Sequence, residues 1–437
     1  MFVPTNGTAV RSAESERTAN GPSPGWRLNV VKAPVAAPTA EEIVADKVSQ
    51  FGRSRREVAA RMARHYKVEM PDDVKAFFDA VEANRWDELD ALFNSISARH
   101  HATPPVPEID AVWPAVLDAF GAAQQAHDWP AQKLLDYGQA VMDSLRPGMV
   151  YLGGTDSGRW VPALMNTSEG ERHVVITQNA LADDKYLEYV GFLYGDRLVT
   201  LGPEDGKAAR QAYLDDACRR LEHDEQFPDE PRQIRPGENI RFSSGVGEKG
   251  FGDGRVQASG MPSVMTVNEA LLKLLLERNP ELSFALEESY PMKFTFAEAT
   301  TAGPIMELRV RDEQNTLTRE RAAESVDYWR GLTQQLMADP EFTQSHHARA
   351  SYSKLLASQA GLLVERNFLA EAEQTFRYAN ELCPSSPEAV YRYVNLLVAQ
   401  GRIQDALPVA EAAVRADVNN RQQFRGLVEE LNRMRTR

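Results

Sequence analysis

The C-terminal part of the chain repeats itself at an offset of 34 residues, and this repeat limits the possible folds more than any other feature. The alignment runs over residues 353–418 and places Asn367 on Gly401 and Ala379 on Ala413. In each copy an apolar run is followed by a turn and a second amphipathic run, which indicates two helices joined by a turn. The matching alanines suit positions where two helices approach closely. We therefore expect two repeated helix pairs in this part of the chain.

Small, aromatic and proline residues occupy fixed positions in the first copy, namely Ala372, Phe376, Ala379 and Pro384. Pro384 ends the copy because a proline ring cannot continue a helix. This pattern resembles the tetratricopeptide repeat. The second copy departs from it, with Ala410 at the aromatic position and Val418 at the closing proline. The resemblance implies stacked helix pairs, and residues 421–434 are expected to form a capping helix.

The composition is that of a soluble globular protein with an acidic surface. The 437 residues are 43% hydrophobic and 26% charged, and their formal net charge is −14. This charge repels phosphate backbones and anionic lipids, so nucleic-acid binding is not expected. The sequence shows neither a membrane span nor a secretory signal, which predicts a cytoplasmic protein. An exported form stays open if the start is misassigned.

Composition and hydrophobic period divide the chain into four regions. Residues 1–38 are rich in Pro, Gly, Ser, Thr and Ala and predict a disordered tail. Residues 39–146 predict an all-helical region, in which the helix pair at 72–96 is a candidate degenerate repeat. Residues 147–311 predict an α/β domain, and residues 312–437 predict the helical repeats with their capping helix. The expected fold class is a multidomain protein that combines helical regions with a central α/β domain.

The hydrophobic period changes at Arg146. Two apolar runs at 149–152 and 173–177 are separated by a Gly-rich turn and a helical segment, the order of a βαβ unit. Continuous apolar strands are typical of sheets covered on both faces, so we expect a mostly parallel sheet, with further strands at 282–289 and 304–310. The segments NIRFSS and RVQASG flank the Gly-rich stretch 245–254, which predicts either a hairpin or a long flexible loop.

A second resemblance rests on the order of the segments MVYLGGTDSGRWVPAL, RHVVITQNAL, VMTVNEALLKLLLERN, LSFALEESYPM and AGPIMELRV. This order is similar to the soluble region of glycosyltransferase-like membrane proteins of the O-mannosyltransferase type, which also ends in tetratricopeptide-like repeats. The similarity covers residues 147–418 and does not include the membrane-embedded part that holds the transferase chemistry there. It therefore implies a shared accessory module. As a whole, the chain resembles soluble repeat proteins of bacteria such as Verrucomicrobia and Planctomycetes.

The Gly-rich turn after the first strand is the sharpest candidate for a ligand site. A turn between a strand and a helix gathers backbone N–H groups at the positive end of the helix dipole, where anions bind. The candidate ligand-binding residues are Gly153, Gly154, Thr155, Asp156, Ser157 and Arg159. The spacing is neither GxGxxG nor a P-loop. The alternative is a tight turn in which Asp156 or Ser157 caps the helix.

Other polar residues carry weaker signals. Gln178, Asn179 and the pair Glu287–Glu288 follow strands, where ligands bind in parallel sheets, although adjacent strand residues point to opposite faces. The histidine pairs 100–101 and 346–347 and the two distant cysteines lack metal-ligand spacing, so no metal or cofactor is expected. Hydrolase and metalloprotease motifs are also missing. No catalytic residue is assigned, and a non-enzymatic role is favoured.

Two functions remain open. The favoured one is a scaffold in which the repeats bind a protein or peptide partner, and its candidate contacts are Lys354, Gln359, Arg392 and Asn395. The alternative is an α/β domain that recognises a phosphorylated or nucleotide-linked sugar through the turn at Gly153–Arg159. A structural reading, in which the repeats pack on the α/β domain and mediate self-association, also stays open because two repeats are few for an independent solenoid.

Overall fold

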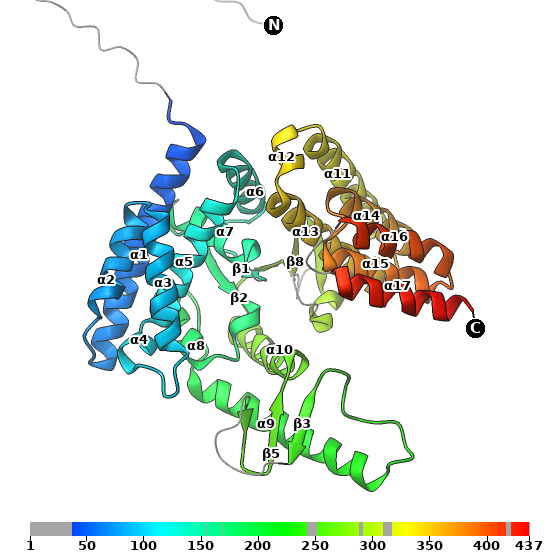
Figure 1. Cartoon of the computed structure of the whole chain (residues 1–437), viewed down its shortest axis with the longest axis horizontal. Helices are drawn as coiled ribbons and strands as arrows, with labels where there is room; N and C mark the ends of the chain where they lie inside the picture. Colours follow the sequence, from blue (N-terminus) through cyan, green and yellow to red (C-terminus); the bar gives the residue numbers. More distant parts are fainter. Residues whose placement is uncertain are drawn as a thin grey trace, which may run out of the picture. The chain divides into compact units, whose positions relative to one another are not determined.

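The computed structural model describes residues 37–154, 156–168, 170–242, 251–287, 292–308, 317–416 and 421–436. Residues 39–437 form one compact unit, whose elements are drawn in Figure 1. Nearly all of the expected tail at residues 1–38, and most of the Gly-rich stretch 245–254, lie outside the described residues. No helix in the described segments is long and apolar enough to cross a membrane.

Within the described residues, six helices precede the first strand: α1 (Ala40–Tyr66), α2 (Asp72–Glu82), α3 (Trp86–His100), α4 (Pro107–Asp110), α5 (Trp113–Asp128) and α6 (Ala131–Asp143). The first helix begins with a capping box, because Thr39 Oγ1 accepts from the N–H of Glu42 and Glu42 accepts from the N–H of Thr39. Helix α1 packs against α2, α5 and α7. Its apolar side, which includes Val44, Val48 and Phe51, is buried in these contacts.

The central sheet has five strands in the order β2-β1-β6-β8-β7. They are β1 (Val150–Gly153), β2 (Val174–Thr177), β6 (Phe284–Leu286), β7 (Ala299–Ala302) and β8 (Ile305–Leu308). The first two strands and β6 run parallel, whereas β8 is antiparallel to both β6 and β7. The sheet is therefore mixed and not mostly parallel. The physical reason is the two-residue turn at Gly303–Pro304, which is too short for anything but an antiparallel hairpin.

Helices and a second, smaller sheet complete the middle of the chain. The additional elements are α7 (Ser157–Ser168), η1 (Gln178–Ala180), α8 (Asp184–Tyr194), α9 (Pro203–Gln226), α10 (Met261–Arg278) and η2 (Lys293–Ala297), with β3 (Asn239–Phe242), β4 (Phe251–Gly252) and β5 (Val256–Ser259). Strand β5 lies between β3 and β4 and is antiparallel to both. The segments NIRFSS and RVQASG thus pair antiparallel, but β4 lies between them in the sequence and pairs with the other edge of β5, so they do not form a simple hairpin. Behind this small sheet, Arg220 of α9 pairs with the buried Glu238 at 2.6 Å.

In the part of the chain after the central sheet that the structure describes, there are seven helices: α11 (Arg319–Met337), α12 (Pro340–Gln344), α13 (His346–Glu365), α14 (Leu369–Leu382), α15 (Pro387–Ala399), α16 (Ile403–Ala416) and α17 (Arg421–Arg435). The pairs α13–α14 and α15–α16 are joined by three-residue turns of the same geometry. Asn367 and Gly401 have φ values of 61° and 72° at the middle of these turns. The N–H groups of Phe368 and Arg402 each reach the carbonyl five residues back at 2.8 Å.

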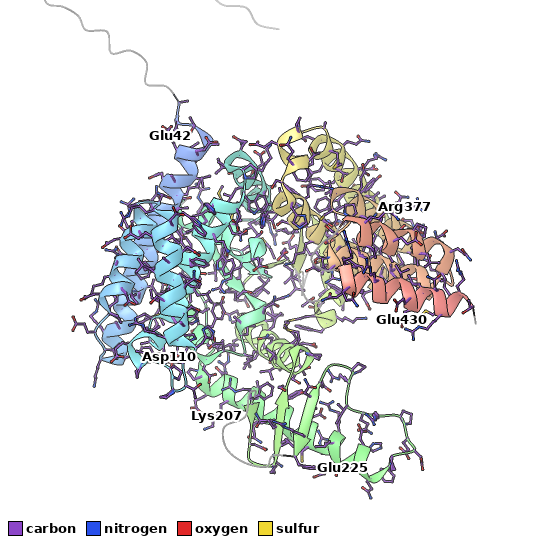
Figure 2. The ribbon with its side chains drawn as sticks, viewed as in Figure 1. Glu42, Asp110, Lys207, Glu225, Arg377 and Glu430 are labelled. Atoms are coloured by element: carbon purple, nitrogen blue, oxygen red, sulfur yellow. The ribbon has the colours of Figure 1, made fainter. Side chains whose placement is uncertain are left out.

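Polar contacts tie the two helix pairs to each other. Glu373 on α14 accepts hydrogen bonds from Arg377 at 2.6 Å and from Arg402 of the next turn at 2.6 and 3.0 Å. Arg377 lies at the surface of these helices (Figure 2). The alanines that match between the copies, Ala372, Ala379, Ala406 and Ala413, are fully buried. Close helix approach is therefore the reason for the small residues at these positions.

Helix α13 also packs against the central sheet. It contacts α6, η2, β7 and β8, and the buried residues from α1 to α17 form one continuous core. Arg366 at its C-terminal end donates to the carbonyl of Ala297 at 2.8 Å. The pair α13–α14, called the first helix pair below, therefore packs on the sheet. This placement creates the site described in the next subsection.

Candidate functional site

A pocket of about 430 Å³ lies where the carboxyl ends of β1 and β6 meet the first helix pair. Its walls come from five helices, α5, α6, α7, α13 and α15, and from the residue after β6. The lining residues are Gln124, Gln125, Asp128, Tyr137, Asp156, Ser157, Gly158, Glu287, His346, His347, Ala350, Ser351, Lys354, Ser385, Ser386, Pro387 and Glu388. Hydroxyl, amide, carboxyl and amino groups dominate this lining. The pocket is therefore suited to a small polar ligand.

The Gly-rich turn forms one side of the pocket. The N–H of Gly154 donates to Glu287 Oε2 at 2.7 Å, and Thr177 Oγ1 donates to the Gly154 carbonyl. Asp156 has a φ of 52°, in the left-handed region that Asp tolerates better than most residues. Gly158 must lack a side chain, because a Cβ there would lie 2.5 Å from Glu287 Cδ and still closer to Oε2. The turn is thus built around the Glu287 carboxylate.

Glu287 is the most unusual group in the pocket. It is 1% exposed, and its Oε1 has no hydrogen-bond partner among the described residues. Burial raises the pKa of Glu287, and the charges of Lys354 and Arg392 only partly oppose this effect. Burial also raises the pKa values of Tyr137 and Tyr151, and the nearby Glu287 adds to the rise. An unsatisfied buried carboxyl oxygen is costly, so it points to a group that meets it when a ligand is bound.

Three helices begin at the pocket. The lining includes the first residues of α7 and α13, and it includes Ser386, the N-cap residue of α15. The Ser386 hydroxyl makes no hydrogen bond to its helix. Amide groups in a first helical turn lack intrahelical acceptors, and the helix dipole favours negative charge there. Together with the ammonium group of Lys354, these helix ends favour an anionic group on the ligand.

The predicted ligand residues separate into two sets. Gly154, Asp156 and Ser157 form the pocket or hold its shape, and the Ser157 hydroxyl donates to Gln125 Oε1 at 2.7 Å. Gly153 ends β1, and a Cβ there would collide with the Gly158 carbonyl. Thr155 lies outside the described residues. Arg159, in contrast, is not one of the described residues that line the pocket.

Arg159 belongs to a buried ion cluster behind the turn. Its guanidinium contacts Asp118 Oδ1 at 3.0 Å and lies over the ring of Tyr186. Asp118 also accepts from Arg55 at 2.9 Å and from the Tyr189 hydroxyl at 2.7 Å. Burial acts to raise the pKa of Asp118, but the charges of Arg159 and Arg55 outweigh it and lower that pKa. Arg159 therefore anchors α7 to α5 and does not close over a ligand.

The four predicted partner contacts also separate. Lys354 lines the pocket, whereas Gln359 is 1% exposed and is held by hydrogen bonds within the core. Arg392 is half-buried, and its guanidinium donates to the carbonyl of Ala357 at 3.2 Å. Asn395 is exposed on α15. Of these four residues, only Asn395 is exposed enough to contact a partner protein directly. Lys354 instead lines the pocket beside the Gly-rich turn.

Several pocket residues could not be recognised in the sequence. Ser385, Ser386 and Glu388 carry only the signal of a helix start, and Tyr137 looks like an ordinary core aromatic. Gln178 and Asn179, which follow β2, are not among the described pocket residues; the carbonyl of Asn179 accepts from Asn268 at 3.0 Å. Glu288 lies outside the described residues.

The two histidine pairs have different environments. His346 and His347 are exposed at the pocket, whereas His100 stacks on Trp113 with ring centroids 4.3 Å apart. The described part of the chain contains no group of His, Cys, Asp and Glu residues that could hold a metal ion. Both cysteines are buried and free.

Comparisons with known proteins find no relative of this chain. No family model, curated protein or solved structure matches the chain. Any function has to be argued from the pocket and its residues.

Proposed function

We propose that this protein binds a small polyhydroxylated ligand with an anionic group, such as a phosphorylated sugar. The observation that carries the proposal is the buried, unpartnered Oε1 of Glu287 in a pocket that also contains Lys354 and three helix starts. Sugar hydroxyls both donate and accept hydrogen bonds, so they suit the mixed lining of Gln125, Ser386 and Glu388. The phosphate suits Lys354 and the helix starts.

The volume of the pocket narrows the ligand class. About 430 Å³ lies in the lower part of the range of about 300–1,000 Å³ for small-molecule sites. At roughly 30 Å³ for each water molecule, this space holds about fourteen waters, close to the roughly sixteen non-hydrogen atoms of a hexose phosphate. A nucleotide-linked sugar fits only if its nucleotide extends out of the pocket.

A thermal-shift titration tests this proposal. Glucose 6-phosphate, UDP-glucose, glucose and inorganic phosphate are the probes, and the protein is the full chain. A phosphorylated sugar at 100 times its Kd stabilises the fold by about 2.7 kcal/mol. Lys354→Met is expected to weaken that binding about tenfold, because it removes a charge-assisted hydrogen bond.

The matched control is Lys75→Met on α2, which removes a lysine that is not among the pocket residues. This variant is expected to bind like the wild type. A wild type that no probe stabilises contradicts the proposal, and so does equal binding by both lysine variants.

Partner binding by the C-terminal helices is a second proposal, favoured by one face of α15. Glu388, Arg392, Asn395 and Ala399 are spaced by three or four residues, so they share one face of the helix. Asn395 and Ala399 are exposed and the other two are half-buried. We also propose that α13–α14 and α15–α16 are tetratricopeptide repeats, which is supported by their equivalent turns and buried alanines. Such repeats bind extended peptides along their inner helices.

Affinity purification with wild-type and Asn395→Arg baits tests the partner surface. The substitution places a long charged side chain on the open face, so proteins held there are expected to be lost. The control bait carries Arg425→Glu, a charge reversal at an exposed position of α17. A protein profile that all three baits share argues against partner binding on α15.

A further inference from the structure

The two carboxyl oxygens of Glu287 have different roles. Oε2 accepts the N–H of Gly154 at 2.7 Å, so it already acts as a hydrogen-bond acceptor inside the protein. Oε1 has no hydrogen-bond partner among the described residues. If the carboxyl group holds a proton, that proton is expected on Oε1, and Glu287 is one of the residues that line the pocket.

We propose that Glu287 is a neutral carboxylic acid in the folded protein and that its Oε1–H donates a hydrogen bond to an anionic oxygen of the bound ligand. Glu287 then determines specificity, because it selects ligands with an acceptor at this position. This inference rests on the proposed function for its ligand, whereas the neutral state of Glu287 is a property of the protein alone.

The surroundings of Glu287 favour the neutral form. The side chain is 1% exposed and lies directly against Gly158, where no side chain separates it from the backbone of α7. Tyr151 of β1 and Tyr137 of α6 are near enough to Glu287 for a charge there to raise their pKa values, and burial is the larger cause of that rise. Burial disfavours a charged carboxylate, and the hydrogen bond from Gly154 opposes this effect only in part.

Charged groups on the other elements act in both directions. Lys354 of α13 and Arg392 of α15 favour the ionised form, and Glu388 of α15 opposes it. Asp128 at the end of α5 and Asp156 before α7 also line the pocket, as do His346 and His347 at the start of α13. The first two add negative charge and so favour the proton on Glu287. Desolvation is the largest single effect, and it raises the pKa of Glu287.

A ligand-free experiment tests the neutral state. The Glu287→Gln variant reproduces the shape and the hydrogen bonds of the neutral acid, because its amide oxygen can accept from Gly154 and its NH₂ group can donate. In the unfolded chain Glu287 ionises near its ordinary pKa of 4.5. A raised pKa in the folded protein therefore stabilises the wild type below pH 4.5, and this stability is lost as the pH rises through the folded pKa.

Urea unfolding of both proteins from pH 4.5 to pH 8 measures this loss. The unfolding equilibrium constant of the wild type is expected to rise relative to that of Glu287→Gln by up to tenfold for each pH unit below the folded pKa, and then to level off. A ratio that stays constant over the whole range overturns the neutral state. Carbon-13 NMR titration of the wild-type glutamate carboxyls gives the same answer if the variant does not fold. One carboxyl is then expected to titrate well above the others.

The second arm measures the Kd of glucose 6-phosphate at one pH below and one pH above the folded pKa that the first arm gives for Glu287. The phosphate titrates in the same way for both proteins, so its own effect cancels in the ratio of the two Kd values. We expect the wild type to weaken relative to Glu287→Gln as the pH rises. An unchanged ratio overturns the donor role while binding itself is retained. If no sugar or phosphate probe binds the wild type, the proposed function and the donor role both fail, and the neutral state is decided by the first arm alone.

Discussion

At the scale of single residues, the most constrained contact is that between Gly158 and Glu287. Gly158 lies in the first turn of α7 with its Cα against the Glu287 carboxyl group. A methyl group has no space there, because the oxygen it would meet also holds the N–H of Gly154. The glycine thus allows a carboxyl group from β6 to reach the start of α7.

We predict that Gly158→Ala destabilises the protein by about 1–3 kcal/mol, the usual cost of overpacking a filled core. It is also expected to disturb Glu287 and so to reduce probe binding. Urea unfolding measures the first effect and the thermal-shift titration the second. Gly331→Ala in α11 is the matched control, because a Cβ there meets no atom within 4 Å.

In the control, alanine is expected to stabilise the helix by about 0.5–1 kcal/mol. If the two substitutions change the free energy of unfolding equally, the contact between Gly158 and Glu287 does not contribute to stability.

At the scale of elements, the turns within three helix pairs have the same geometry. Asn84 between α2 and α3 has a φ of 54°, close to the values at Asn367 and Gly401. The N–H of Arg85 reaches the carbonyl of Ala80 at 2.9 Å, which matches the hydrogen bonds of Phe368 and Arg402. The N-terminal pair was a candidate degenerate repeat, and its turn supports that hypothesis. Asn and Gly tolerate a left-handed conformation, so this turn is visible in a sequence.

The strands show the opposite case. The expected segments for β1, β2, β6 and β8 all form strands, but β7 (Ala299–Ala302) was not expected. Its sequence, ATTA, has little apolar character of its own. The segment forms a strand because it is hydrogen-bonded to β8. The two strands are joined by a turn whose shape the residue pattern does not reveal.

At the scale of the whole molecule, Gln359 joins the first helix pair to the central sheet. Its amide nitrogen donates to the carbonyls of Gly303 and Ile305 at 2.7 and 2.9 Å. Its amide oxygen accepts from Ser325 at 2.8 Å and from Trp329 at 3.0 Å. All the hydrogen-bonding capacity of this buried side chain is used between β7–β8, α11 and α13.

We predict that Gln359→Leu destabilises the protein by roughly 3–5 kcal/mol. Leucine fills a similar volume but leaves four polar groups without their partner, and those of Ile305, Ser325 and Trp329 belong to buried residues, where such a loss is costly. Urea unfolding followed by tryptophan fluorescence measures the loss. Asn395→Leu, at an exposed position of α15, is expected to change stability by less than about 0.5 kcal/mol. A decrease in the free energy of unfolding below about 1 kcal/mol for Gln359→Leu would show that the Gln359 hydrogen bonds contribute little to stability.

The sequence by itself determined the local features of this protein. Hydrophobic spacing, the left-handed residues of the turns and the Gly-rich stretch after β1 depend on neighbours in the chain, so their helices, strands and turns could be predicted. Lys354 and the turn at Gly153–Arg159 were both recognised as candidate sites, but as parts of two rival functions.

Only the tertiary structure decided that they line one pocket, that Arg159 and Gln359 are internal, and that Glu287 is left with an unpaired oxygen. These facts depend on contacts between segments that are far apart in the chain. Burial and hydrogen bonding at such contacts leave no pattern in the sequence.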